Sequence, residues 1–219
     1  MTPLLSFILV CLVTAPALAT TVLQLSFSEV VDHAELIFEG HVSKVETIQT
    51  GPRSIHTRVT FDVINVIKGS YLEPEISLQF LGGEVDGRRL VVQGMQVPET
   101  GETGIFFVES LQEALIHPLV GWSQGHFLLE LDTQGESRVL SAGHVPVTGL
   151  ALTPLAEPTS ETSSEAASEA LEDSIRILGD DGAARGVIID QALPAESGMS
   201  ASDFRAQVQL MLELQQQVP

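Results

Sequence analysis

Residues 36–45 read LIFEGHVSKV, and the alternation in this stretch decides the fold class. One face of an extended chain here carries Leu36, Phe38, Gly40 and Val42. The opposite face carries Glu39, His41 and Ser43. A period of two residues is typical of a β-strand with one buried face. We therefore predict a half-buried strand at the start of the folded region.

Similar signals surround this strand. Ser26 followed by Glu29 forms a capping-box pattern, which predicts a short helix through about Ala34. Turn residues around Gly51 lead to a second alternating strand, with a bulge or bend near Asn65. Further strands are predicted over 76–80, 90–93, 104–108 (apolar enough to be buried on both faces), 121–132 and 138–141. Short strands at near-regular spacing predict a mainly β protein, either a small barrel or a sandwich.

The N-terminal segment differs from the rest of the chain. MTPLLSFILVCLVTAPALATT combines a short apolar run with the small-residue pattern Ala17-Leu18-Ala19. This predicts a secretory signal peptide over residues 1–19, cleaved after Ala19, and a periplasmic or secreted protein. The run is too short to span a bilayer well, so we expect no stable membrane anchor.

The composition changes again after the strands. We assign residues 20–150 to the β domain and residues 151–174 to an acidic linker rich in Ser, Glu and Ala. Residues 175–219 form a C-terminal tail with a helix at about 201–216. One face of that helix carries Phe204, Val208, Met211 and Leu212. We expect this face to dock on the β domain of its own chain, and a partner protein is the open alternative.

Charge and cysteine content exclude several function classes. The formal net charge is −19, with only 10 Lys and Arg residues, so a nucleic-acid partner is disfavoured. Cys11 is the only cysteine and lies inside the predicted signal peptide. The mature chain therefore has no disulfide, no thiol chemistry and no cysteine zinc site.

Residues 121–125 read GWSQG, which matches the G-x-S-x-G nucleophile elbow of α/β-hydrolases. An elbow needs a helix after the serine, whereas the run from Gly125 to Asp132 continues here as strand. Ser123, Asp132 and His144 copy the chain order of a hydrolase triad, but no βα units separate them. We instead interpret the segment as a strand whose small residues Gly121, Ser123 and Gly125 share one face.

The other face of that predicted strand carries the candidate contact residues Trp122, Gln124 and His126. Trp122 is the only tryptophan and could anchor a ligand or a partner. The alternative, which we favour, is that a loop or the C-terminal helix covers it.

We predict no metal site and no cofactor. The six histidines contain neither His-x-His nor His-x-x-x-His, the spacings typical of zinc ligands. A hairpin centred on Gly51 would place His41 opposite about Thr60, and His56 opposite about Val45, too far apart to share a ligand sphere. The Asp180-Asp181-Gly182 stretch and the glycine-rich 82–87 stretch both read as turns.

Three segments together carry a family resemblance. Residues 32–42 (DHAELIFEGHV) resemble the opening of a netrin-like (NTR) domain, the fold shared with tissue inhibitors of metalloproteinases (TIMP). Residues 60–69, ending in Lys68-Gly69, are similar to the second strand of that fold, and residues 101–107 to its "G-E … F" strand. The layout over residues 25–132 also resembles a group of uncharacterised secreted bacterial proteins.

The resemblance implies an OB-like five-stranded Greek-key β-barrel. It does not imply protease inhibition, because inhibitors of this fold chelate zinc through an N-terminal cysteine, and the predicted mature N-terminus is Thr20. We therefore expect an exported, non-enzymatic module that binds a ligand or another extracytoplasmic protein. The alternatives are a regulator of an extracytoplasmic metalloprotease and, less favoured, a serine hydrolase using Ser123.

Overall fold

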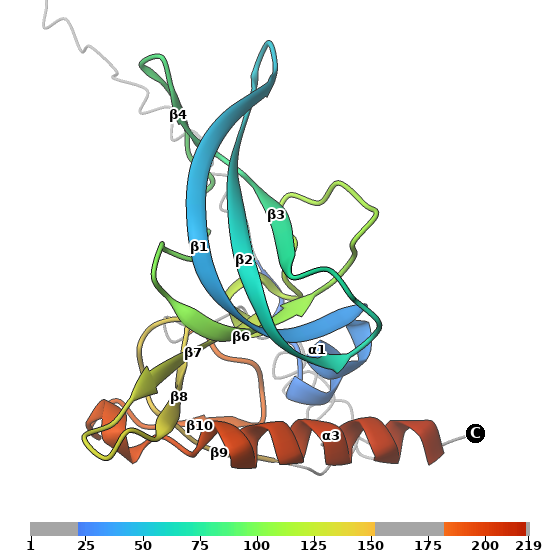
Figure 1. Ribbon diagram of the computed structural model, residues 1–219, viewed down its shortest axis with the longest axis vertical. Coiled ribbons are helices and arrows are strands. Elements are labelled where there is room, and N and C mark those ends of the chain that lie inside the picture. Colours follow the sequence, from blue (N-terminus) through green and yellow to red (C-terminus); the bar gives the residue numbers. More distant parts are fainter. Residues whose placement is uncertain (1–21, 152–181, 218–219) are drawn as a thin grey trace, which may run out of the picture.

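The computed structural model describes residues 22–151 and 182–217 (Figure 1). The predicted signal peptide lies outside these residues, and so does the predicted linker apart from Ala151. In the described part the protein is mainly β, with a short N-terminal helix and a longer C-terminal one, as the sequence predicts.

Six antiparallel strands form the main sheet, in the order β3-β2-β1-β6-β7-β8. Their bounds are β1 Leu36–Gly51, β2 Ser54–Lys68, β3 Glu75–Leu81, β6 Thr103–Val108, β7 His126–Leu131 and β8 Ser137–Ser141. Two small sheets pair β4 (Gly83–Val85) with β5 (Arg88–Leu90), and β9 (Val147–Leu150) with β10 (Val187–Ile189). The helices are α1 (Phe27–His33) and α3 (Ala201–Gln217), with 3-10 turns η1 (Trp122–Gly125) and η2 (Ala195–Ser197).

The main sheet is open. Strands β3 and β8 form its two edges and do not pair with each other. The closed barrel expected from the sequence is therefore not confirmed. The fourth predicted strand, over 90–93, is also displaced, because β5 ends at Leu90 and pairs with β4 across a turn at Asp86 and Gly87.

The hairpin of β1 and β2 curves away from the helices (Figure 1). Gly51 pairs with Ser54, so the turn lies at residues 52–53, beyond the predicted centre. His41 consequently lies opposite Asp62, and His56 opposite Ile48, which corrects the predicted register. The bulge predicted near Asn65 is present, because the pairing skips Ile64.

A pair of glycines marks the place where β1 meets β6. Gly40 lies directly opposite Gly104. A Cβ on Gly104 would lie 2.5 Å from the carbonyl oxygen of Phe127, and one on Gly40 would lie 2.7 Å from the Phe38 ring. Side chains would not fit at either position, so the glycines allow β1, β6 and β7 to pack closely.

The Lys68-Gly69 pair at the end of β2 holds helix α1 in place. The Lys68 ammonium donates hydrogen bonds to the carbonyl oxygens of Val31 and Asp32, at 2.7 and 2.8 Å. Such a contact satisfies carbonyl groups that a helix C-terminus leaves unpaired. The N-terminus carries the predicted capping box, with the Glu29 backbone N–H donating to Ser26 Oγ at 3.2 Å.

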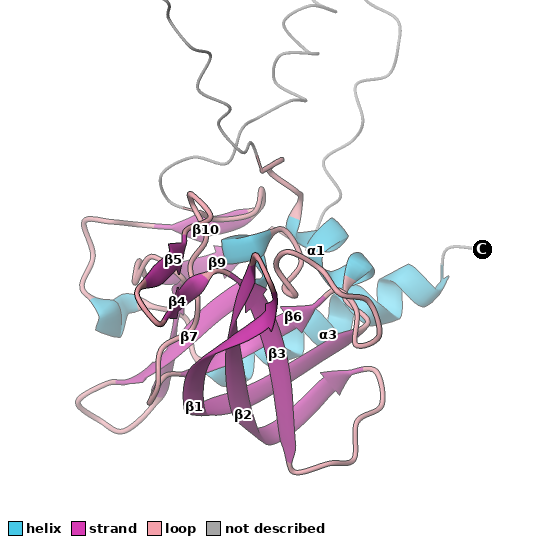
Figure 2. Ribbon diagram, turned by 90° about the horizontal axis from the view of Figure 1, so that it is seen from above, coloured by secondary structure: helices cyan, strands magenta, loops and turns pink. Residues whose placement is uncertain are grey.

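The C-terminal helix docks on its own chain, as expected. Phe204, Val208 and Met211 are buried in one apolar cluster with α1, β6 and β7. Arg205 also forms a 2.6 Å ion pair with Glu39 of β1. Figures 1 and 2 both show α1 beside α3. Within the described residues, no helix combines the length and the apolar character needed to cross a bilayer.

Candidate functional site

The GWSQG segment is not a strand. Gly121 and Trp122 have left-handed backbone conformations, with φ of 57° and 63°, and residues 122–125 form the 3-10 turn η1. These conformations end any extended pairing, so β7 begins only at His126. The predicted division of this segment into a small face and a Trp122 face is therefore wrong.

The small residues in the segment still have a packing role. A Cβ on Gly125 would lie 2.6 Å from the carbonyl oxygen of Val120. The Ser123 hydroxyl donates a hydrogen bond to the carbonyl oxygen of Gly182, at 3.1 Å. Close backbone approach thus explains these positions, although it occurs in a tight turn and not on a strand face.

The residues of the hypothetical hydrolase triad have other partners. The hydroxyl of Ser123 bonds to backbone, as described above. His144 Nδ1 lies 3.2 Å from Glu130 Oε1, and Asp132 accepts a 2.8 Å hydrogen bond from Arg138. A nucleophilic serine needs its base within hydrogen-bond reach, and neither residue is placed as that base.

Gln124 is a structural residue. Its side chain is buried, not exposed beside Trp122. The amide donates to the carbonyl oxygens of Leu23 and Gly121, at 2.8 and 3.0 Å, and accepts from the Leu25 backbone N–H at 2.7 Å. Gln124 therefore fixes the segment before α1 against η1, and this corrects its assignment as a contact residue.

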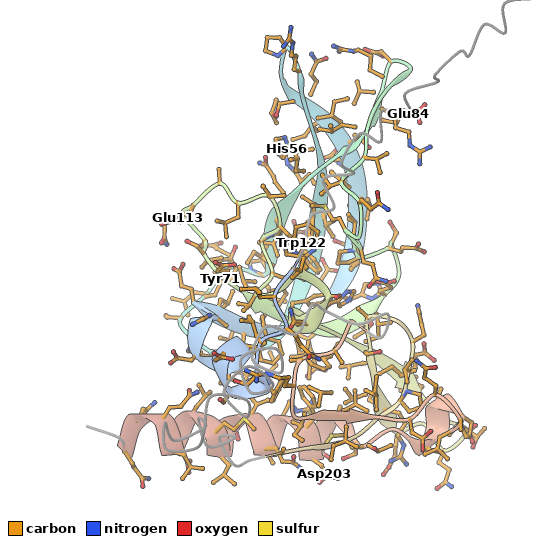
Figure 3. The ribbon with its side chains drawn as sticks, turned by 180° about the vertical axis from the view of Figure 1, so that it is seen from behind. His56, Tyr71, Glu84, Glu113, Trp122 and Asp203 are labelled. Carbon is orange, nitrogen blue, oxygen red and sulfur yellow. The ribbon has the colours of Figure 1, made fainter. Side chains whose placement is uncertain are left out.

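Trp122 is half-buried and stacks on a buried histidine. Its ring lies nearly parallel to that of His117, at 11°, with centroids 5.6 Å apart. His117 belongs to the loop before η1, so a loop covers one face of Trp122, as favoured from the sequence. Figure 3 shows Trp122 well away from Asp203, which lies at the start of α3.

His117 is held as a neutral ring. The Leu119 backbone N–H donates to Nδ1 at 3.2 Å, so Nε2 carries the proton and donates to the carbonyl oxygen of Gln96, also at 3.2 Å. Burial lowers the pKa of His117 to about 4. The ring thus links Trp122 to the loop that contains Gln96.

That loop forms one wall of a pocket with a volume of about 950 Å³. Residues 95–97 and 99–103 line it on one side, and residues 128–130 of β7 and the turn 142–144 line the rest. His126, at the start of β7, also reaches it. Of the three contact residues predicted from the sequence, only His126 lines this pocket.

His126 and Glu102 form an unusual pair in the pocket wall. Nε2 of His126 lies 3.8 Å from Oε2 of Glu102, and neither atom has a hydrogen-bond partner or exposed surface. The side chain of His126 is 6% exposed, and its ring stacks on Phe106. The side chain of Glu102 is 20% exposed, and Glu102 is among the residues that line the pocket.

The distance alone would allow an ion pair, but the pKa values oppose it. Burial lowers the pKa of His126 to about 3, with the neighbouring His117 and His144 adding to the effect, so the ring is neutral at neutral pH. Burial also raises the pKa of Glu102. A hydrogen bond from the Glu99 backbone and a protonated His144 favour the charged form of Glu102, but burial outweighs them and the pKa stays raised.

Two more carboxylates, Glu99 and Glu130, lie in the wall of the pocket. His144 also lines it, beside Glu130. No Lys or Arg is among the residues that line it. The sequence had no signal for this arrangement, because the loop 95–103 and the turn 142–144 meet only in the folded chain.

The His and carboxylate side chains of the described residues do not indicate a metal site. Among the described residues, no group of three or more His, Cys, Asp or Glu side chains is placed to hold an ion. Structural and catalytic zinc sites use at least three protein ligands.

A scan of protein families, a search of curated proteins and a search of solved structures gave no match for this chain.

Proposed function

We propose that this protein is an exported, non-enzymatic binding module and that its ligand occupies the pocket beside Glu102 and His126. The observation that supports this is the pair of buried polar atoms, Oε2 and Nε2, left without partners in a pocket wall. Buried polar groups are nearly always hydrogen-bonded, and an unsatisfied one costs about 1–3 kcal/mol. Such a cost is tolerated where the groups serve a function.

A binding role fits the geometry better than acid–base catalysis. A general acid or base must come within hydrogen-bond reach of the reacting group. The two inner atoms are buried, so acid–base chemistry through them would require the side chains to move. A bound ligand needs only the exposed part of Glu102 and the surrounding wall.

The proposal also keeps the export and fold assignments made from the sequence. The signal-peptide pattern supports a periplasmic or secreted location, with a small ligand or another extracytoplasmic protein as partner. The order β3-β2-β1-β6-β7 is compatible with an OB-like Greek-key arrangement in which β3 and β7 do not pair. We propose this NTR/TIMP-like relationship from the resemblance and the strand order together.

The test is a nuclear magnetic resonance screen of the purified, ¹⁵N-labelled protein against a defined fragment set containing cations, anions and neutral molecules. The proposal predicts hits that shift the amide signals of Thr103, His126 and Glu130. Thr100→Trp would fill the pocket mouth and remove these shifts, since Thr100 is an exposed lining residue. Thr148→Trp, at an exposed position of β9 outside the pocket lining, is the matched control and keeps them. Hits that survive Thr100→Trp, or an absence of hits, would refute the proposal.

A further inference from the structure

We infer that the group bound in this pocket is a protonated amine, recognised through the carboxylate of Glu102. The inference rests on the proposed function, since it names the ligand chemistry of the same pocket. It is carried by the charges that line the pocket and by the partly exposed carboxyl group of Glu102, whose buried Oε2 lies 3.8 Å from the equally unpartnered Nε2 of His126.

The charge of the pocket wall favours a cation. Glu99, Glu102 and Glu130 contribute carboxylates, and no Lys or Arg lines the pocket. Glu99 lies close enough to Glu102 for repulsion between the two carboxylates to raise the Glu102 pKa further. An anionic ligand would add to this repulsion, whereas a cation would relieve it.

The Glu102–His126 pair identifies Glu102 as the carboxylate that a bound cation would stabilise. Taking a carboxylate out of water is costly unless an opposite charge or hydrogen-bond donors replace the water. His126 does not supply the charge, because its buried ring is neutral at neutral pH, and His144 lowers the Glu102 pKa by less than burial raises it. An ammonium group on the exposed part of Glu102 would supply both a charge and N–H donors.

The remaining wall suits the carbon chain of an amine. Met95, Val97, Leu128 and Ala142 line the pocket with apolar atoms beside the carboxylates. Alkyl chains that carry an ammonium group pack along such surfaces while the charge stays on polar groups. A free amine and a lysine side chain of a partner protein share this chemistry.

The experiment compares probes of one size and different charge. The purified protein is titrated with n-butylammonium, n-butanol and butyrate at pH 7 and low salt, and the amide shifts of Thr103, His126 and Glu130 are followed. We expect n-butylammonium to bind at the pocket, butyrate not to bind, and n-butanol to bind at least tenfold more weakly. N-acetyl-lysine-methylamide is titrated in parallel. Tighter binding than n-butylammonium assigns the amine to a lysine side chain, and equal or weaker binding assigns it to a free amine.

Two variants and a control test which carboxylates bind the ammonium group. Glu102→Gln keeps the shape and removes the charge, so it should weaken n-butylammonium binding about tenfold, the loss expected for one charge-assisted hydrogen bond. Glu130→Gln, at an exposed position, should weaken n-butylammonium binding about threefold. This second variant provides the test if Glu102→Gln does not fold. Glu109→Gln removes an exposed carboxylate outside the pocket lining and should leave binding unchanged.

The possible failures are distinct. Equal or tighter binding of butyrate or n-butanol, or unchanged n-butylammonium binding in Glu102→Gln and Glu130→Gln, overturns the amine and leaves the pocket as a binding site. Binding of Zn²⁺ at His126 without binding of any amine overturns it as well. If neither these probes nor the fragment set shifts the pocket signals, the amine and the proposed function both fail.

Discussion

Replacing Phe204 by alanine tests whether α3 belongs to the folded core. The ring of Phe204 is fully buried and lies 5.7 Å from the ring of Phe27 and 4.9 Å from that of Phe127. Truncating a buried phenylalanine costs about 3–5 kcal/mol. Because aromatic pairs contribute about 0.5–1.5 kcal/mol beyond the area they bury, we expect a loss of about 4 kcal/mol.

The assay is urea unfolding of the purified protein, followed by circular dichroism and by Trp122 fluorescence. Leu214→Ala is the matched control on the same helix, because Leu214 is 45% exposed and should cost less than about 1 kcal/mol. A thermal scan should show a drop of about 10 °C for Phe204→Ala and little change for the control. A loss below about 1 kcal/mol in Phe204→Ala would refute the docking of α3 on the sheet.

Three further predictions concern the residues around η1. His117 has a pKa of about 4 in the folded state, below its unfolded value, so the stability it contributes is present above about pH 6.5 and is lost as the pH falls toward 4. Lowering the pH from 7.5 to 4.5 should therefore reduce the free energy of unfolding by about 2–3 kcal/mol more in the wild type than in His117→Gln. Equal reductions in the two proteins would contradict the neutral buried ring. Gly125→Ala should cost more than about 2 kcal/mol in urea unfolding because its Cβ meets backbone, whereas Gly149→Ala, with only ordinary contacts, should cost less than about 1 kcal/mol. Ser123→Ala should lose about 1 kcal/mol through its bond to Gly182, and labelling of wild-type Ser123 by a fluorophosphonate probe would reopen the hydrolase alternative.

Local patterns in the sequence predicted local structure well. The capping box at Ser26 and the bulge near Asn65 depend on residues close in the chain, and both are present. The apolar face of α3 was also readable, because Phe204 and Val208 repeat at helical spacing. These features could be predicted because the geometry of a helix or a strand fixes the spacing of the residues that form them.

The errors arose where backbone conformation departs from the periodic pattern. Trp122 fits a strand by alternation, but its φ of 63° places it in a turn. A left-handed conformation at a bulky residue is held by its surroundings, here the stack on His117, and leaves no local sequence signal. The same turn placed Gln124 inside the molecule, where its amide meets backbone groups from the segment before α1.

The candidate site was only partly predictable for a related reason. His126 was identified, but for its supposed position beside Trp122 on a strand face. Glu102 was missed, because its closeness to His126 depends on the pairing of β6 with β7 and on the turn that precedes β6. No regular spacing in the sequence indicates a contact between segments that are separated in this way along the chain.

The most direct test of the central claim is a crystal structure of the protein soaked with n-butylammonium. The account predicts difference density in the pocket, with the ammonium nitrogen about 2.8–3.0 Å from a carboxylate oxygen of Glu102 and the butyl chain against the apolar wall. An empty pocket at a concentration that saturates the resonance shifts, or density for the probe only elsewhere on the surface, would contradict it.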